Sequence, residues 1–406
     1  MKYLRTVSTR RLLASVAGLL VAAVAGTAIA VAASGSGPVP QPKRLAQAIH
    51  DALTAPKVAG ISARISFTNH LIDASNLQGH DPILSGATGR LWLSGDRLRL
   101  ELQSDNGDAQ VVVNQGSFWV SEPGSNTVYE GKLPANHGPG AKPKSDAGEI
   151  PSIAKIQSEL NKLAGRVDLS SAIPTDVAGQ PTYTVRVSPR HDGGLLGAGE
   201  LAWDAAKGTP LRFAVYARGN STPVLELKAT DITYGAVAAS NFAISPPSGA
   251  KVVTVSTPNS DHGSAAKSGA RDRRHHELRG AAAVAKRLPF SLVAPQRLVG
   301  LPRQSVTLLD WAGKPAALVT YGQGLGGIAV IEQTPSANGS ASSAAGKGSG
   351  GDRQGLSLPT VSIHGSTAQE LDTALGTVIH FTRGGVAYTV VGSVPPAAAD
   401  LAARAL

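Results

Sequence analysis

Hydrophobic and polar residues alternate with a period of two through much of the chain, which predicts many short β-strands. The clearest case is residues 89–102, where two alternating runs flank Gly95-Asp96. A two-residue turn there makes an antiparallel hairpin with one apolar face and one polar face. Trp92 then lies beside Arg99 on the polar face, where a cation–π contact is expected. The apolar face consists of Leu91, Leu93, Leu98, Leu100 and Leu102.

Further strands are predicted on both sides of this hairpin, and two short helices interrupt them. The strands cover residues 61–67, 110–114, 117–120, 127–132, 182–187, 199–204, 210–217, 224–233 and 252–255. One helix begins at Leu45 and has apolar residues at every fourth position, and the other is capped by Ser152. The apolar stripe of the second helix is Ile153, Ile156, Leu160 and Leu163. Strands in this number predict a large antiparallel sheet with two helices in its concavity.

A second β-rich region is predicted to begin near Leu288, after a polar and basic linker over residues 256–287. Its strands cover residues 306–311, 316–321, 328–332, 378–383 and 386–391, with a hairpin turn at Gly384-Gly385. Thr367 and Glu370 have the spacing of a capping box, which predicts a short helix. Pro395-Pro396 open a terminal helix. Residues 334–354 are mostly Gly, Ser and Ala, which predicts a disordered loop.

The N-terminal residues predict a location outside the cytoplasm. Residues 12–33 carry no charge and follow four basic residues, and they are long enough to span a bilayer. Small residues at positions 28–32 also fit a signal-peptide cleavage site. Residues 1–33 are therefore a membrane anchor or a cleaved signal peptide, and residues 34–42 are a Pro- and Gly-containing spacer.

Composition excludes several classes of function. The net charge is +10, but eight of these charges lie in the leader and the linker, which argues against nucleic-acid binding. The absence of cysteine excludes disulfides and thiolate metal sites. Aromatic residues make up only 4% of the chain, which disfavours stacking platforms for sugars or bases.

No catalytic or cofactor motif stands in the context that its chemistry requires. Gly322–Gly327 matches G-x-G-x-x-G, but a predicted strand follows it where a dinucleotide site needs a helix. His275-His276 lie in the basic linker, where a solvated charge run is the simpler interpretation. There is no nucleophile elbow. We therefore expect a protein that is not an enzyme and that needs no metal or cofactor.

Three segments resemble the LolA-like superfamily, which comprises lipoprotein carriers of the LolA type and sensors of the MucB/RseB type. They are residues 89–100, 201–212 and 242–250. The resemblance covers residues 43–255 and implies an antiparallel half-barrel whose helices form a lid over a concavity for acyl chains. Glu332, Gly365 and residues 384–396 resemble the trailing domain of RseB-like sensors, which implies a smaller α+β domain over residues 288–406.

The leading hypothesis is a non-enzymatic binding protein that holds a lipid or a lipoprotein in the half-barrel. The five leucines of the hairpin would line the concave face, and the stripe of the Ser152-capped helix would form the lid. One alternative is an RseB-like envelope-stress sensor that regulates an anti-sigma factor. A transporter in the membrane is another conceivable protein partner. A further alternative is a structural cell-envelope protein with a filled core and no ligand, since sequence does not distinguish a filled core from a lidded cavity.

Overall fold

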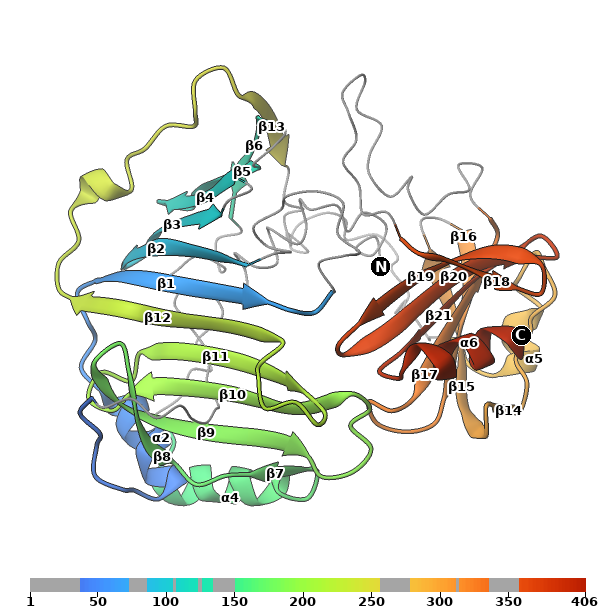
Figure 1. The fold of residues 1–406 in the computed structure, drawn as a ribbon, viewed down its shortest axis with the longest axis horizontal. Helices are drawn as coiled ribbons and strands as arrows, with labels where there is room; N and C mark the ends of the chain where they lie inside the picture. The colour runs from blue at the N-terminus through green and yellow to red at the C-terminus, as the bar shows by residue number, and fades with distance from the viewer. Residues whose placement is uncertain are drawn as a thin grey trace, which may run out of the picture.

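The computed structural model describes residues 37–72, 86–104, 107–122, 126–133, 150–255, 278–311, 314–335 and 358–406. The fold is mainly β with a few helices, as predicted, and its strands form two sheets (Figure 1). Within these ranges no helix combines the length and the hydropathy needed to cross a bilayer. The predicted leader, most of the basic linker and all but the first two residues of the predicted disordered loop lie outside the described residues.

The first sheet contains thirteen strands and curls into a half-barrel (Figure 1). Its order is β13-β6-β5-β4-β3-β2-β1-β12-β11-β10-β9-β7, and β8 also pairs with β9. All neighbours are antiparallel except β13 and β6. The strands are β1 (Ile61–Asn69), β2 (Ala87–Ser94), β3 (Arg97–Ser104), β4 (Gly107–Asn114), β5 (Ser117–Glu122), β6 (Thr127–Lys132), β7 (Val167–Leu169), β8 (Ile173–Val177), β9 (Gln180–Pro189), β10 (Leu196–Asp204), β11 (Pro210–Ala217), β12 (Leu225–Tyr234) and β13 (Lys251–Val255).

The β2–β3 hairpin forms in the predicted register. Leu93 lies opposite Leu98, and Leu91 lies opposite Leu100. Gly95 has a φ of 60°, which the two-residue turn requires and which glycine adopts without strain. On the other face, the guanidinium of Arg99 lies 4.9 Å from the centre of the Trp92 ring, which confirms the predicted cation–π contact.

The two predicted helices of the first region are α2 (Leu45–Thr54) and α4 (Ile153–Leu163). Ser152 caps α4 as predicted, because its side chain accepts a hydrogen bond from the backbone N–H of Lys155. The two helices pack against each other and lie beside β7, β8 and β9 at one end of the sheet (Figure 1). The buried residues of α2 are Ala46 and Ala48, whereas Leu53 is 41% exposed.

The second sheet contains eight strands in the order β14-β15-β16-β17-β21-β20-β19-β18. Two helices, α5 (Ala281–Ala285) and α6 (Pro396–Arg404), cover one face of it. Val284 of α5 is fully buried in this core, so the packed region takes in residues that the sequence assigned to the linker. The strands are β14 (Arg297–Leu298), β15 (Leu301–Trp311), β16 (Lys314–Tyr321), β17 (Ile328–Gln333), β18 (Thr360–Ile363), β19 (Ser366–Thr373), β20 (Gly376–Arg383) and β21 (Val386–Gly392).

The helix predicted from Thr367 and Glu370 is wrong, because this segment is strand β19. His364 and Gly365 both have positive φ and form a two-residue turn that joins β18 to β19. Strand pairing therefore resumes directly at Ser366, so Thr367 lies inside a strand and does not cap a helix. Ala368 is fully buried in the core of the sheet, so tertiary packing overrides the local capping signal.

The G-x-G-x-x-G motif forms a turn that contacts the first sheet. β17 follows it, as the sequence predicted. The backbone N–H of Leu325 donates to the carbonyl of Asp192 at 3.2 Å. Nearby, the N–H of Leu195 donates to both the carbonyl and the hydroxyl of Ser393, each at 3.0 Å. We call the loops around Asp192, Gly194, Leu325 and Ser393 the inter-sheet seam.

We expect Gly194→Ala to loosen this seam. Gly194 has a φ of 60°, and a Cβ there would collide with the backbone carbonyl of Ser393. Strain and collision together should cost about 1–3 kcal/mol and raise hydrogen exchange at residues 193–195 and 392–394. Gly219→Ala is the matched control, because Gly219 has a similar φ of 81° and open space around it. Equal exchange in the two variants would show that the seam does not hold the sheets together.

Candidate functional site

One face of the first sheet is apolar across most of its strands. Residues opposite each other in the register share this face, which runs from Val185 on β9 to Val120 on β5. It includes Val185, Leu201, Phe213, Leu227, Phe67, Ala87, Leu91, Leu100, Val111 and Val120. We call it the concave face, because the sheet curls towards it and the helices α2 and α4 lie on it at one end.

The five leucines predicted as ligand-binding residues all lie on the concave face. They belong to a single cluster with residues of β1, β4, β5, β11 and β12. Four of them are buried and Leu91 is partly buried. Among the described residues, this cluster contains strand and loop side chains and no residue of a helix.

The predicted lid residues lie at one end of the same face, beside β7. Ile156 and Leu160 are buried against Ala46 of α2 and Leu169 of β7. Ile153 and Leu163 extend beyond this contact and are 39% and 49% exposed. The structure thus brings the leucines together and the helix residues together, but it keeps the two groups apart. The leucines lie on β2 and β3 near the middle of the sheet, whereas the helix residues lie beside β7 at one end of it.

A polar group without a partner lies beneath α2. Trp203 is buried beside Tyr183, with ring centres 6.3 Å apart, under Ala48. Within the part of the chain that the structure describes, its indole N–H has no hydrogen-bond partner. The hydroxyl of Tyr183 donates to the carbonyl of Gln41, which ties the segment before α2 to the sheet. The helix therefore covers this end of the concave face, but the hydrogen-bonding capacity of the buried Trp203 indole is not met by any described residue.

The opposite, convex face is covered in part by residues 238–250, which we call the strap. The carbonyl of Asn241 accepts from Arg99, and the carbonyl of Ile244 accepts from the indole of Trp119. The ring of Phe242 is buried under the guanidinium of Arg97, at 5.2 Å. The strap thus crosses β3, β4 and β5 before the chain enters β13.

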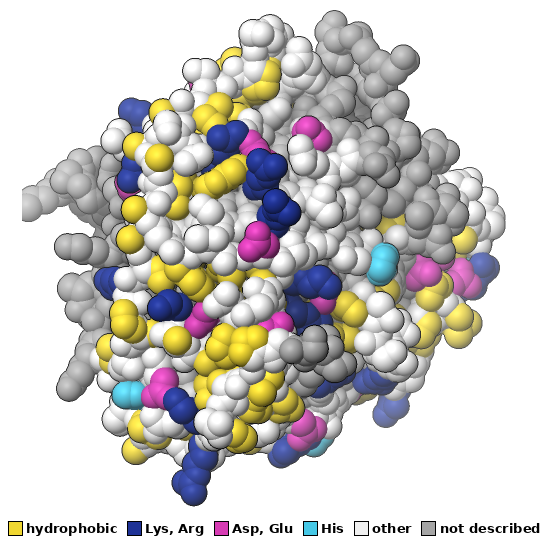
Figure 2. Space-filling view, turned by 60° about the vertical axis from the view of Figure 1, so that its left-hand side comes forward, with side chains coloured by type: hydrophobic (Ala, Val, Ile, Leu, Met, Phe, Trp, Pro, Cys, Tyr) yellow, Lys and Arg dark blue, Asp and Glu magenta, His cyan; other side chains and the backbone are white. Residues whose placement is uncertain are grey.

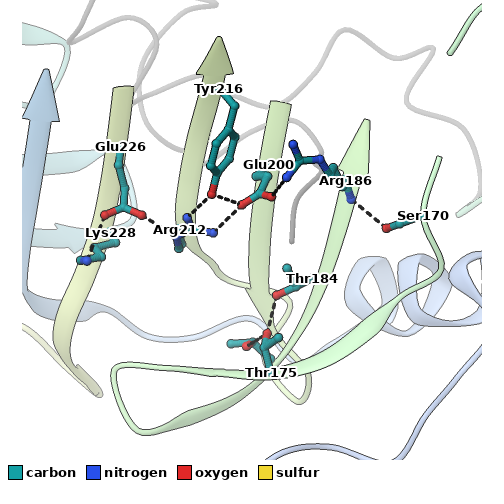
Figure 3. A network of polar contacts seen from close by, with 10 residues as sticks. Ser170, Thr175, Thr184, Arg186, Glu200, Arg212, Tyr216, Glu226 and Lys228 are labelled. Atoms are coloured by element: carbon teal, nitrogen blue, oxygen red, sulfur yellow. Dashed lines mark hydrogen bonds and ion pairs between the residues drawn. The ribbon is translucent and has the colours of Figure 1, made fainter. Parts of the chain in front are cut away.

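A ladder of charged side chains crosses the convex face of β9–β12 (Figure 3). Its centre is Arg212, which donates to Glu200 at 2.9 Å, to Glu226 at 2.7 Å and to the hydroxyl of Tyr216 at 2.9 Å. Arg186 extends it through Glu200 at 2.7 Å, and Lys228 extends it through Glu226 at 2.9 Å. We call these residues the ion ladder.

Burial and hydrogen bonding shift the pKa values of the ion ladder in opposite directions. Burial alone would lower the pKa of Arg212, but hydrogen bonds to Tyr216, Glu200 and Glu226 outweigh it and raise the pKa. For Glu226, burial would raise the pKa, but hydrogen bonds from Lys228 and Arg212 lower it. A carboxyl with a lowered folded-state pKa stabilises the fold at neutral pH and loses that contribution as the pH falls. The ion ladder therefore joins four strands through buried charges that neutralise one another.

Arg212→Met should destabilise the protein by about 3–5 kcal/mol, because it leaves Glu200 buried with fewer partners. Lys228→Met is the control, since Lys228 is 42% exposed and its loss should cost no more than about 1 kcal/mol. Urea unfolding of both variants provides the measurement. Equal midpoints for the two variants would contradict a central role for Arg212.

The second sheet buries an ionisable carboxyl. Glu332 is fully buried, and its Oε2 accepts from the backbone N–H of Val293 at 2.8 Å. Its Oε1 has no hydrogen-bond partner among the described residues. Burial raises the pKa of Glu332 to about 7. Burial and the nearby Glu332 carboxyl also raise the pKa of Tyr321 to about 12.

Glu332 should make stability depend on pH. The folded state holds its proton more tightly than the unfolded state, so stability should fall by up to about 3 kcal/mol as the pH rises from about 4.5 to about 7. Glu332→Gln removes this titration, so its gain in melting temperature should be larger at pH 8 than at pH 5. Glu159→Gln, at an exposed ion pair, is the control. A gain that does not change with pH would contradict the buried-carboxyl account.

The surface is mixed in charge. Figure 2 shows Lys and Arg side chains next to carboxylates and hydrophobic side chains on one side of the molecule, without a uniform basic patch. In the part of the chain that the structure describes, no group of three His, Asp or Glu side chains could hold a metal ion. The His275-His276 pair lies outside that part.

The ion ladder was missed by sequence reasoning, although the sequence carries a signal for it. Arg186, Glu200, Arg212 and Glu226 follow one another at separations of 14, 12 and 14 residues. Such separations are typical of charges that return to the same face on successive hairpins. Their burial could not be predicted, because it depends on how the finished sheet packs.

No protein-family model matches the chain, and no curated protein matches it. Several solved structures are similar. A chain of the MucA/MucB complex from Pseudomonas aeruginosa is 16% identical, with 88% of this chain and 96% of that chain covered and a TM-score of 0.40. A LolA superfamily protein from Nitrosomonas europaea is 9% identical, with 50% of this chain and 98% of that chain covered and a TM-score of 0.20.

Proposed function

We propose that the protein is a non-enzymatic binding protein that holds an acyl chain of a lipid or lipoprotein on the concave face. The observation that carries this proposal is the extent of that face, which is apolar from β5 to β9 while α2 and α4 pack at one end of it. A flexible hydrocarbon chain can bind along such an apolar face without specific polar contacts.

The energetics suit such a ligand. Each buried methylene contributes about 0.8 kcal/mol, so about a dozen of them contribute roughly 10 kcal/mol before the cost of association. The leucines and valines of the cluster supply apolar contact along the whole row. Selectivity would then depend on chain length and on polar groups near the ends of the face.

The sequence of the leader supports a place for this activity outside the cytoplasm. Residues 12–33 would direct the chain to or through a membrane, whether they anchor it or are cut. A protein at that location would meet acylated molecules at the membrane surface. A tethered chain would present its ligand locally, whereas a secreted chain could carry it.

Ala63→Phe tests the proposal. Ala63 lies opposite Leu91 on the concave face and is partly buried. In a face that opens onto a ligand, the larger ring should occupy the ligand's space and weaken binding of a fluorescent long-chain fatty acid at least tenfold, with little change in melting temperature. Ala206→Phe, at an exposed turn, is the matched control and should bind as the wild type does.

The opposite pattern would support a filled core. An inserted ring should then cost about 1–3 kcal/mol by overpacking, and the wild type should show no saturable fatty-acid binding. Unchanged binding in Ala63→Phe would place any ligand elsewhere. The structural cell-envelope alternative predicts a filled core, in which the inserted ring destabilises the protein and the wild type shows no saturable fatty-acid binding.

A further inference from the structure

The outward side chains of β1 and β2 form an open strip on the convex face. The strap contacts Arg97 and Arg99 on β3, and the ion ladder begins with Lys228 on β12, so the strip lies between these two covered regions. The strip is polar. Its members, which we call the arginine patch, are Ser62, Arg64, Ser66, Thr88 and Arg90.

The patch holds two like charges in direct opposition. Arg64 on β1 lies opposite Arg90 on β2, and both are exposed. Like charges directly opposite each other on neighbouring strands are destabilising. Among the described residues neither arginine forms a hydrogen bond or an ion pair, so ten N–H donors on two guanidinium groups face solvent.

The neighbouring acidic residues do not neutralise this pair. Glu101, beside Arg90 in the register, accepts hydrogen bonds from Arg99 and from Gln110. Asp231, beside Arg64, is exposed and forms no ion pair with it. The two arginines therefore remain available to an external anion.

Hydroxyl groups and a bulge complete the surroundings. Ser66 lies opposite Thr88 one step along the strands, and Ser62 lies on the other side of Arg64. The register between β1 and β12 shifts beside Arg64, where Thr230 is the additional residue. Bulges re-aim side chains and are over-represented beside binding sites. The strip thus offers charged forks with the hydroxyl groups of Ser66 and Thr88 on one side and the hydroxyl of Ser62 on the other, where Trp92 is its partner on β2.

We propose that the arginine patch binds a single phosphate group, either that of a phospholipid head group or that of a soluble phosphate compound. Guanidinium forks match phosphate oxygens in a bidentate manner, and hydroxyl groups can donate to the remaining oxygens. An extended acidic peptide fits less well, because it would meet Asp231 on one side and Glu101 on the other. One compact anion contacts both arginines and avoids both carboxylates.

The test compares Arg64→Gln/Arg90→Gln with Arg218→Gln/Arg383→Gln, which removes the same charge from two exposed arginines elsewhere. Titration with inorganic phosphate, followed by calorimetry, measures the site itself. Sedimentation with phosphatidylcholine vesicles, with and without phosphatidylglycerol, measures the lipid source. We expect at least a tenfold loss of phosphate affinity in the patch variant and wild-type affinity in the control. Arg64→Lys/Arg90→Lys should bind with intermediate affinity, because it keeps the charge but not the forks.

The outcomes are distinguishable. Loss of both phosphate and anionic-vesicle binding in the patch variant supports a head-group site. Loss of phosphate binding without any vesicle binding in the wild type supports a soluble phosphate ligand. Equal affinity in the patch and control variants, or no phosphate binding by the wild type, overturns the proposal. Fatty-acid binding should be unchanged in the patch variant, so this test does not depend on the concave face.

Discussion

The register of the strands is the constraint on which the rest of this structure depends. Because side chains alternate between faces, a slip of one residue at the β2–β3 hairpin would turn every leucine from the concave to the convex face. The turn at Gly95 prevents such a slip, and each following pair inherits its register. The apolar concave face and the polar convex face are both consequences of this one alignment.

The two faces are stabilised in different ways. The concave face depends on the burial of aliphatic side chains, which is not directional. The convex face depends on specific partners, in the ion ladder across β9–β12 and in the strap across β3–β5. Such directional contacts join neighbouring strands of the convex face. The strip around Arg64 and Arg90 lies between these two regions, and both of its arginines are exposed.

Local patterns in the sequence predicted local structure well. The β2–β3 hairpin, the Ser152 cap and the turn at Gly322–Gly327 were predicted correctly, because each follows from residues close in sequence. The helix predicted at Thr367 was wrong, because the sheet on both sides of that segment decides its structure. The leucine face was predicted, but the location of α2 and α4 at its far end was not, since this depends on contacts such as Ala46 with Ile156. The ion ladder was not predicted from the sequence, because its residues meet only when four strands pair in the correct register.

Native mass spectrometry tests the central claim most directly. Residues 34–406 would be expressed in a bacterial host, purified without detergent and measured before and after extraction with organic solvent. If the concave face holds an acyl chain, the first spectrum should contain an additional mass of several hundred daltons that extraction removes, and lipid analysis of the extract should identify an acylated compound. A protein that carries no extractable mass, and that takes up none when lipids are added, would contradict the account.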